Sequence, residues 1–333
     1  NGQGVWINAS GNITVDGVIN GTDLGFPLAF GPGTGLAAST TGGGHGGTST
    51  LFLNPYGNAT APTSLGSGGG DKAGGSAIKL QADSGVIEID GILDFSGGNT
   101  GSGNGNGAGA GGSIWLKANN ITGTGNISVK GGSTSATGNA NPGAGGRMRL
   151  EYGSSLEFTG IIKTEKGYDV DLVRFHEGTL TFTNNTWPGD WTVNGNVSLL
   201  GGDYGEGNVT NIQGSLIVPA GNILHIYGDC YSTTASGVAC YNKTAEGRGV
   251  WLNASGNITV ESGGIIDGYR LGFSFGKGPG YAGVAGSHGG LGYLGGPTYG
   301  EETGPVSLGS GGENSSANSG QGGSAIKLEA SSG

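Results

Sequence analysis

Three carboxylates stand close together in the sequence, at a spacing that a polysaccharide-cleaving site could use. Glu88, Asp90 and Asp94 follow one another at intervals of two and four residues, and even spacing along a strand places side chains on one face. Glycoside hydrolysis needs two carboxylates that converge on one bond. A structural role fits equally, because Glu88 alternates with the apolar Ile87 and Ile89 and Asp90 precedes a glycine, as in many turns. We expect an exposed polar face here and predict that the chain is not an enzyme.

Two histidines and a glycine-rich run are the residues whose types could serve metal or phosphate chemistry. His45 and His288 each begin a His-Gly-Gly triplet, and a single histidine of this kind more often holds a loop than a metal. Residues 66–72 place a lysine after glycines but lack the Gly-Lys-Ser/Thr ending of a phosphate-binding loop. The sequence therefore predicts no metal site and no cofactor.

Tryptophans fall into two groups. Trp6, Trp115 and Trp251 stand at the start of apolar segments, and we expect them in the core. Trp187 and Trp191 flank a Pro-Gly-Asp turn, where they would form either an exposed platform for sugars or a packed turn. The packed turn is the favoured interpretation.

The two cysteines, Cys230 and Cys240, lie ten positions apart. Their spacing fits no zinc motif, and no further His or Cys completes one. We predict a local disulfide that closes a surface loop, worth about 2.7 kcal/mol on the loop-entropy model. The alternative is a pair of free thiols in a reducing compartment.

Asparagine-linked glycosylation signals are unusually frequent. Chance would give about five Asn-X-Ser/Thr acceptors in a chain of this composition. The acceptors present are Asn8, Asn12, Asn20, Asn58, Asn120, Asn126, Asn184, Asn196, Asn208, Asn242, Asn253, Asn257 and Asn314. This excess predicts an N-glycosylated protein located outside the cell or at its surface.

Composition narrows the class of protein further. Glycine accounts for 80 of the 333 residues, and Lys plus Arg (14) against Asp plus Glu (24) gives a formal net charge of −10. A nucleic-acid partner is not expected, because such binders need cations to replace displaced counterions. No apolar run approaches the roughly 20 residues of a membrane span. The first residue is not Met and the last residues stop within a pattern, so we expect both ends to be cuts in a longer chain.

Internal repetition is the strongest signal in the sequence. Residues 4–15 and 249–260 differ at a single position, Ile7 against Leu252. Further matches follow in the same order, including His45-Gly-Gly with His288-Gly-Gly, residues 64–69 with 307–312, and residues 74–80 with 322–328. We therefore expect one full repeat of about 245 residues over 1–248, and the start of the next repeat over 249–333.

Apolar and polar residues alternate in short blocks, and helical periodicity is nearly absent. Blocks such as 77–98, 113–132 and 147–164 each contain what we expect to be three short strands, with Ile78 and Leu80 on one face and Lys79 on the other. These features predict an all-β fold, a parallel β-helix or β-solenoid with three short strands per coil. Glycine-rich segments at 42–47, 66–75, 97–112 and 131–146 are expected to protrude as loops, and a β-sandwich is the competing fold.

A family resemblance supports the same fold. The runs Gly-Gly-Gly-His-Gly-Gly (42–47), Leu-Gly-Ser-Gly-Gly-Gly (65–70) and Gly-Gly-Ser-Ala-Ile-Lys-Leu (74–80) resemble the glycine-rich repeats of very large secreted proteins similar to the pectin-lyase-like parallel β-helices. The resemblance covers roughly 1–164 and 249–333, whereas 165–248 fits it poorly and is expected to be a variant β segment containing the cysteine loop. It implies extracellular architecture and transfers no catalytic residue.

These observations predict a structural segment of an extracellular, N-glycosylated filament or cell-surface fibre built from stacked β-solenoid repeats. The expected partner is the protein itself, by axial stacking, with neighbouring fibres or surface glycans as further partners. Two alternatives stay open: an adhesin or carbohydrate-binding stalk, and a polysaccharide-degrading β-helix enzyme.

Overall fold

The structure is a computed structural model in which the regular secondary structure of the described residues is β-strand. It describes residues 2–34, 40–47, 55–101, 107–134, 141–167, 178–182, 186–200, 209–228, 249–269, 271–273, 276–281, 285–291, 297–300, 302, 307–312 and 322–331. The chain forms two compact units, the first from Asn1–Asn184 with Asn194–Ser198 and the second from Asn185–Val193 with Leu199–Gly333. Within the described part of the chain, no helix has the length and apolar character that crossing a bilayer requires.

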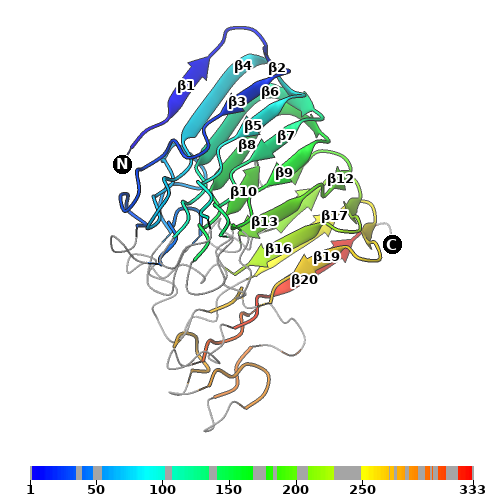
Figure 1. Ribbon diagram of the computed structural model, residues 1–333. Helices are drawn as coiled ribbons and strands as arrows, with labels where there is room; N and C mark the ends of the chain where they lie inside the picture. Colours follow the sequence, from blue (N-terminus) through cyan, green and yellow to red (C-terminus); the bar gives the residue numbers. More distant parts are fainter. Residues whose placement is uncertain are drawn as a thin grey trace. The chain divides into compact units, whose positions relative to one another are not determined.

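The first unit is built on two parallel sheets (Figure 1). Its strands are β1 (Val5–Asn8), β2 (Ile13–Val15), β3 (Val18–Asn20), β4 (Ala77–Ile89), β5 (Ile92–Asp94), β6 (Ser113–Gly123), β7 (Asn126–Ser128), β8 (Arg147–Phe158), β9 (Ile161–Lys163) and β10 (Thr179–Phe182). One sheet has the order β4-β6-β8-β10, with β1 and β2 both paired to β4, and the other has the order β3-β5-β7-β9. The predicted all-β class is confirmed, with successive segments of the chain lying beside one another in parallel.

The core of this unit follows from the alternation of apolar residues. Ile78 pairs with Ile114 and then Met148, and Leu80 pairs with Leu116 and then Leu150. All six side chains are at most 4% exposed, so the expected stacking of these positions is confirmed. Each row buries aliphatic groups at about 0.8 kcal/mol per methylene, which stabilises the ladder beyond its hydrogen bonds.

Strand lengths differ from the expectation of three short strands per block. The segments at 77–80 and 86–89 belong to one long strand, β4, whose register against β6 shifts between Ala82 and Val86. Such an irregularity absorbs extra residues and bends the strand while pairing continues on either side. Each of the three blocks therefore contributes one long strand and one short strand, for example β4 and β5.

Glycine-rich segments do not protrude as expected. The described parts of 66–69, 107–112 and 141–146 are buried, and their main chains hydrogen-bond one another, as in Gly43 N–H to the Ala108 carbonyl (2.8 Å) and Ala144 N–H to the Gly43 carbonyl (2.9 Å). A Cβ at Gly143 would lie 1.8 Å from the Gly109 carbonyl oxygen, and one at Gly109 would lie 1.7 Å from that of Ala73. Glycine is needed here because only main chain without side chains packs this closely.

The second unit repeats the parallel arrangement. Its strands are β11 (Thr186–Trp187), β12 (Trp191–Thr192), β14 (Val209–Ile212), β15 (Leu216–Val218), β16 (Ile223–Tyr227), β17 (Val250–Ala254), β18 (Ile258–Val260), β19 (Ile265–Asp267) and β20 (Ile326–Ala330), while β13 (Asn196–Leu200) spans the boundary between the units. The sheets run β11-β14-β17-β20 and β12-β15-β18, and β16 pairs with β19. The described parts of 165–248 thus also consist of short strands.

Candidate functional site

The three carboxylates considered for catalysis occupy an exposed face and its turns. Glu88 is exposed between Ile87 and Ile89, which are 0% exposed. Asp90 Oδ1 accepts hydrogen bonds from the Thr124 N–H (2.9 Å) and hydroxyl (3.0 Å). Asp94 Oδ1 accepts one from the Ser96 N–H (3.1 Å). The polar-face interpretation is confirmed, and the described residues contain no cluster of His, Cys, Asp or Glu suited to a metal ion.

His45 lies at the centre of a buried polar cluster. Its side chain is 0% exposed, with Nδ1 2.8 Å from the Gly111 carbonyl oxygen and the ring 4.8 Å from that of Tyr56. The Tyr56 hydroxyl donates to the Leu65 carbonyl (2.5 Å), and the Ser67 hydroxyl donates to Tyr56 Oη (2.9 Å). Burial, aided by nearby Arg147, lowers the pKa of His45 to about 3, so the ring is neutral at physiological pH.

The same cluster occurs in the second unit. His288 and Tyr299 lie 4.8 Å apart, the Tyr299 hydroxyl donates to the Leu308 carbonyl, and the Ser310 hydroxyl donates to Tyr299 Oη (2.9 Å). Ser310 Oγ also accepts from the Gly280 N–H, as Ser67 Oγ does from the Gly33 N–H, both at 2.9 Å. The cluster joins separate glycine-rich segments in each unit, so its evident role is to fix them.

Sequence reasoning singled out the two histidines but missed their partners. The signal was present: His45 and His288, Tyr56 and Tyr299, and Ser67 and Ser310 are each separated by 243 residues. A constant offset means that no insertion separates the three members, as expected of residues held together in space. The expected loop-holding role of the histidines fits this geometry.

Three tryptophans expected in the core lie on the outer face of the sheets. Trp6 is 62% exposed, and Trp115 and Trp251 are half-buried. The prediction was wrong because Trp6 and Trp115 pair with Lys79, whose side of the strand is opposite to Ile78 and Leu80. Alternation therefore requires them to face outward.

A lysine lies between the outward tryptophans. Lys79 Nζ is 4.1 Å from the centroid of Trp6 and 3.9 Å from that of Trp115, and in the second unit Lys327 Nζ is 3.5 Å from Trp251. These are cation–π distances, each worth about 0.5–1 kcal/mol at exposed sites. A hollow of about 370 Å³ lies beside them and is lined in part by Gln3, Thr63 and residues of β1.

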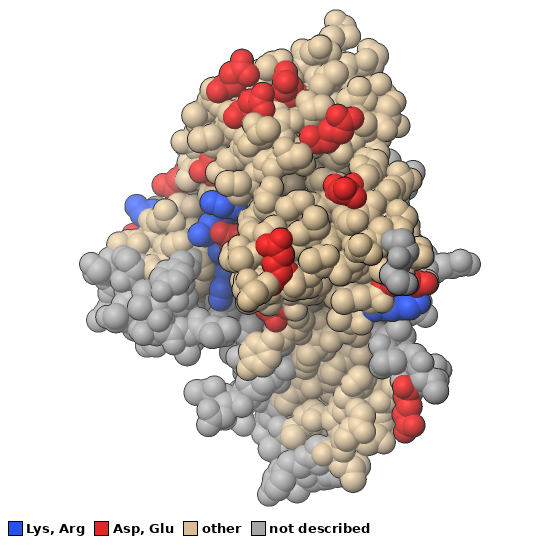
Figure 2. Space-filling model, turned by 90° about the vertical axis from the view of Figure 1, so that its right-hand side faces the viewer, with Lys and Arg blue, Asp and Glu red and all other residues tan. Residues whose placement is uncertain are grey.

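Charged side chains extend this outer face. Glu151 lies 3.0 Å from Lys117 and 3.2 Å from Arg149, and it accepts a hydrogen bond from Trp115 Nε1 (3.1 Å). Partial burial raises the pKa of Glu151, but the hydrogen bonds from Lys117 and Arg149 outweigh it and hold the pKa below its usual range. Figure 2 shows Lys and Arg in small groups and Asp and Glu scattered over the face in view. These pairs resemble a stabilising ladder more than a ligand site.

Trp187 and Trp191 form a packed turn, as favoured. They are 3% and 1% exposed, and their rings stack at 5.1 Å with an interplanar angle of 17°. Trp187 Nε1 donates to the Asp190 carbonyl (3.1 Å). Neither ring offers a free face to a sugar.

The glycosylation acceptors divide by exposure. Asn8, Asn12, Asn20, Asn58 and Asn257 are exposed, whereas Asn120, Asn126, Asn196 and Asn253 are half-buried. Asn184, Asn208, Asn242 and Asn314 lie outside the described residues, as do Cys230 and Cys240. The disulfide stays a prediction.

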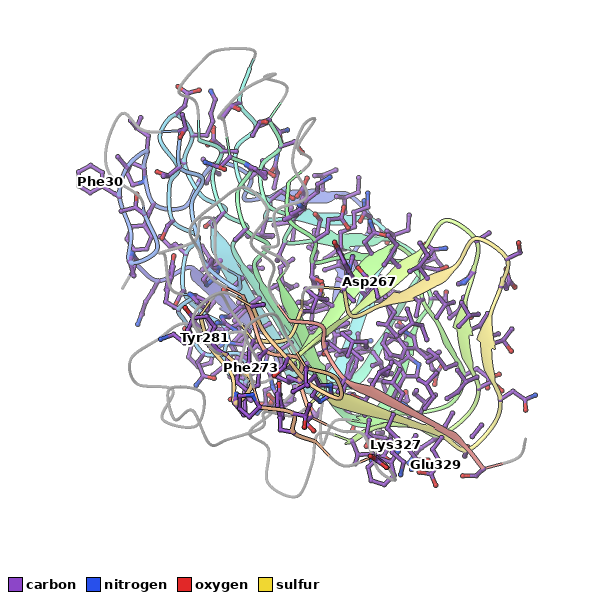
Figure 3. The ribbon with its side chains drawn as sticks, turned by 90° about the horizontal axis from the view of Figure 1, so that it is seen from below. Phe30, Asp267, Phe273, Tyr281, Lys327 and Glu329 are labelled. Atoms are coloured by element: carbon purple, nitrogen blue, oxygen red, sulfur yellow. The ribbon has the colours of Figure 1, made fainter. Side chains whose placement is uncertain are left out.

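Apolar side chains are exposed where each unit's outermost strand lies. On β1, which ends its sheet, Val5 is 61% and Ile7 is 42% exposed; on β20, Ile326 is 39% and Leu328 is 47% exposed. Figure 3 shows Lys327 and Glu329 on β20, 3.0 Å apart, and Phe30 of the first unit projecting away from the ribbon. In the part of the chain that the structure describes, both of these strands lie at the end of a sheet.

Comparisons with family models, with curated proteins and with solved structures found no match to this chain. The resemblance to pectin-lyase-like β-helices therefore stays a prediction.

Proposed function

We propose that the chain is a structural segment of an extracellular, N-glycosylated filament or cell-surface fibre, in which β-solenoid units of this kind stack along one axis. The observation that carries the proposal is a pair of edge strands, β1 in the first unit and β20 in the second, which among the described residues pair on one side only and have exposed aliphatic side chains. An uncovered edge with unpaired N–H and C=O groups is a template for another strand.

Order of the strands along the chain supports the solenoid interpretation. The path β4, β5, glycine segment, β6, β7, glycine segment, β8, β9 places each long strand beside the preceding long strand and each short strand beside the preceding short one. In such an arrangement every unit contacts its neighbours along the axis, and units can be added without a new type of contact.

Glycans fit the proposed surface. Asn12 and Asn58 of the first unit and Asn257 of the second are exposed, so the transferring enzyme could reach their side chains. Charged residues make up only 11% of the chain, and glycans in their place would keep fibres apart.

Neither alternative gains a specific observation. The tryptophan pair proposed as a sugar platform is buried, and Asp90 and Asp94 are engaged in turns. We therefore retain the structural proposal alone.

X-ray diffraction from oriented native fibres tests the proposed function. Strands stacked along the fibre axis should give a meridional reflection at about 4.8 Å. Native material that forms no fibre, or fibres with that reflection on the equator, would contradict axial stacking.

A further inference from the structure

We propose that residues 4–24 form an acceptor edge for one further β-segment with the sequence character of residues 209–228, supplied by the neighbouring unit of the filament. The inference rests on the proposed function and specifies the contact that would join the units. It is drawn from a comparison between two nearly identical segments, one covered and one uncovered.

Burial differs sharply between these matching segments. Val5 and Ile7 are 61% and 42% exposed, whereas their counterparts Val250 and Leu252 are 2% and 0% exposed. The same contrast appears beyond the strand, at the Leu-Gly-Phe triplets 24–26 and 271–273. Leu24 is 65% exposed, whereas its counterpart Leu271 is 1% exposed. Because residues 4–15 and 249–260 differ at one position, sequence cannot account for the difference.

The cover over the second segment is residues 209–228. Strand β14 pairs in parallel with β17, β15 with β18, and β16 with β19. At the end of this cover, the Gly228 N–H donates to the Leu271 carbonyl (2.7 Å). The strands β1, β2 and β3 carry the matching sequence on the first unit and lie at the outer edge of its sheets.

Transferring the observed pairing fixes the register of the proposed contact. Thr210 pairs with Leu252 and Asn211 with Asn253, so a docked segment would place Thr210 on Ile7 and Asn211 on Asn8. Leu216 pairs with Ile258, which corresponds to Ile13.

Side chains support the same register. Asn253 Nδ2 donates to Asn211 Oδ1 at 3.1 Å, and Asn8 carries the same amide. One contact would change: His225 lies 3.3 Å from Asp267, but the matching residue on β3 is Asn20. The acceptor edge would thus bind through hydrogen bonds and apolar contact, without that ion pair.

The occupant must be an additional segment rather than the chain's own copy of 209–228. In the folded chain β14 already pairs on both sides, with β11 and with β17. The alternative occupant is the β20 edge of a second molecule. However, β20 adds a strand to β17, whereas β18 and β19 are the last strands of their own sheets. A molecule that paired with β20 would therefore leave β18 and β19 without a neighbouring strand.

A synthetic peptide of residues 209–228 tests the proposal directly. Added to the intact chain, it should bind saturably and slow amide hydrogen exchange over residues 5–20. Ile7→Lys should weaken binding about tenfold or more, because it places a charge in the apolar contact while the side chain is exposed in the unbound chain. The matched control is Thr14→Lys on the outward face of β2, which should bind as the unaltered chain does.

Register is tested by disulfide trapping. Adjacent parallel strands lie about 4.8 Å apart, within the range that a disulfide spans. A chain with Asn8→Cys should therefore cross-link to a peptide with Asn211→Cys and not to one with Asn222→Cys. Equal cross-linking of both peptides, absence of saturable binding, or unchanged binding by the Ile7→Lys chain would overturn the inference.

Failure of this inference is distinguishable from failure of the proposed function. Native fibres with the axial 4.8 Å reflection but no peptide binding would mean that units stack through another contact. A second measurement uses a chain in which residues 209–248 are joined directly ahead of residue 4. The same segment directly precedes residue 249 in the natural order of the chain. The fluorescence of Trp6, obtained by subtracting that of a Trp6→Phe version, is then measured with a soluble quencher. Weaker quenching of Trp6 than in the chain without the added segment means that Trp6 is buried and supports the proposal. Equal quenching in the two chains overturns it.

Discussion

Buried polar groups recur at matching places in the two units, and His45 is the one with the clearest physical consequence. Its ring is fully buried and held between Tyr56 and the Gly111 carbonyl. A buried ring without a nearby anion is stable only when neutral. The cluster therefore couples the packing of glycine-rich segments to the protonation state of one side chain.

We predict that His45 makes the first unit sensitive to acid. Its pKa is about 3 in the folded chain against an ordinary value of 6.5, so the unfolded chain binds a proton more readily between these limits. Stability should fall as the pH decreases from 6.5 towards 3, by roughly 5 kcal/mol at most from this group. His45→Gln should flatten that part of the profile, as measured by urea unfolding at several pH values. Identical pH profiles for the two proteins would contradict the prediction.

Trp6 and Trp115, which face outward beside Lys79, show which side-chain positions could be predicted from the sequence and which could not. The alternation that correctly placed Ile78 and Leu80 in the core also implies that Lys79 and its partners face outward. Trp115 was expected in the core because it stands at the start of an apolar segment, but the alternation around it points its side chain outward. The lysine between the rings explains the position physically, because the cation lies on the aromatic faces while its stem covers apolar surface.

At the scale of the element, the glycine-rich segments form a layer in which main chains touch directly. Gly143→Ala would put a methyl group 1.8 Å from the Gly109 carbonyl oxygen, so the main chain must move. We expect the first unit to lose about 2–3 kcal/mol in urea unfolding. Gly11→Ala is the control, because nothing lies within 4 Å of a Cβ there, and its effect should stay within about 0.5 kcal/mol. Equal effects of the two substitutions would refute direct main-chain packing.

One row of the ladder allows a matched test of burial. Ile7, Leu80 and Leu116 pair in sequence across β1, β4 and β6, yet Leu116 is 0% and Ile7 is 42% exposed. Leu116→Ala should cost about 2–5 kcal/mol, because it leaves a cavity in the core. Ile7→Ala should cost less than about 1 kcal/mol in the isolated chain. A similar cost at both positions would mean that β1 is already covered in solution.

The presence of strands, and which of their side chains face the core, could be predicted from the sequence. The lengths of the strands and the packing of the glycine-rich segments could not. Alternation along 114–117 correctly places Ile114 and Leu116 in the core and leaves Trp115 and Lys117 half-buried. The joining of two short strands into β4 depends on pairing with β6 across an irregularity, a tertiary effect. Burial of the glycine segments depends on contacts between segments far apart in the chain, such as Gly42 with Pro142, and a local glycine count does not distinguish that from a flexible loop.

An exported protein should carry the covalent modifications of its secretory route. Glycans should occupy exposed acceptors of native material, with Asn12 and Asn257 modified alike, and Cys230 should be bonded to Cys240. Peptide mass mapping without reductant measures both. Unmodified asparagines at every acceptor, or two alkylatable thiols, would contradict export through an oxidising, glycosylating compartment.

Stacking of units along one axis can be seen by electron microscopy of a chain that carries several consecutive copies of residues 1–248. If each copy supplies the segment that covers the β1 edge of the next, the chains should form unbranched rods whose length increases in proportion to copy number. Separate globular particles joined by flexible linkers, with a spacing that varies between molecules, would mean that the units do not stack.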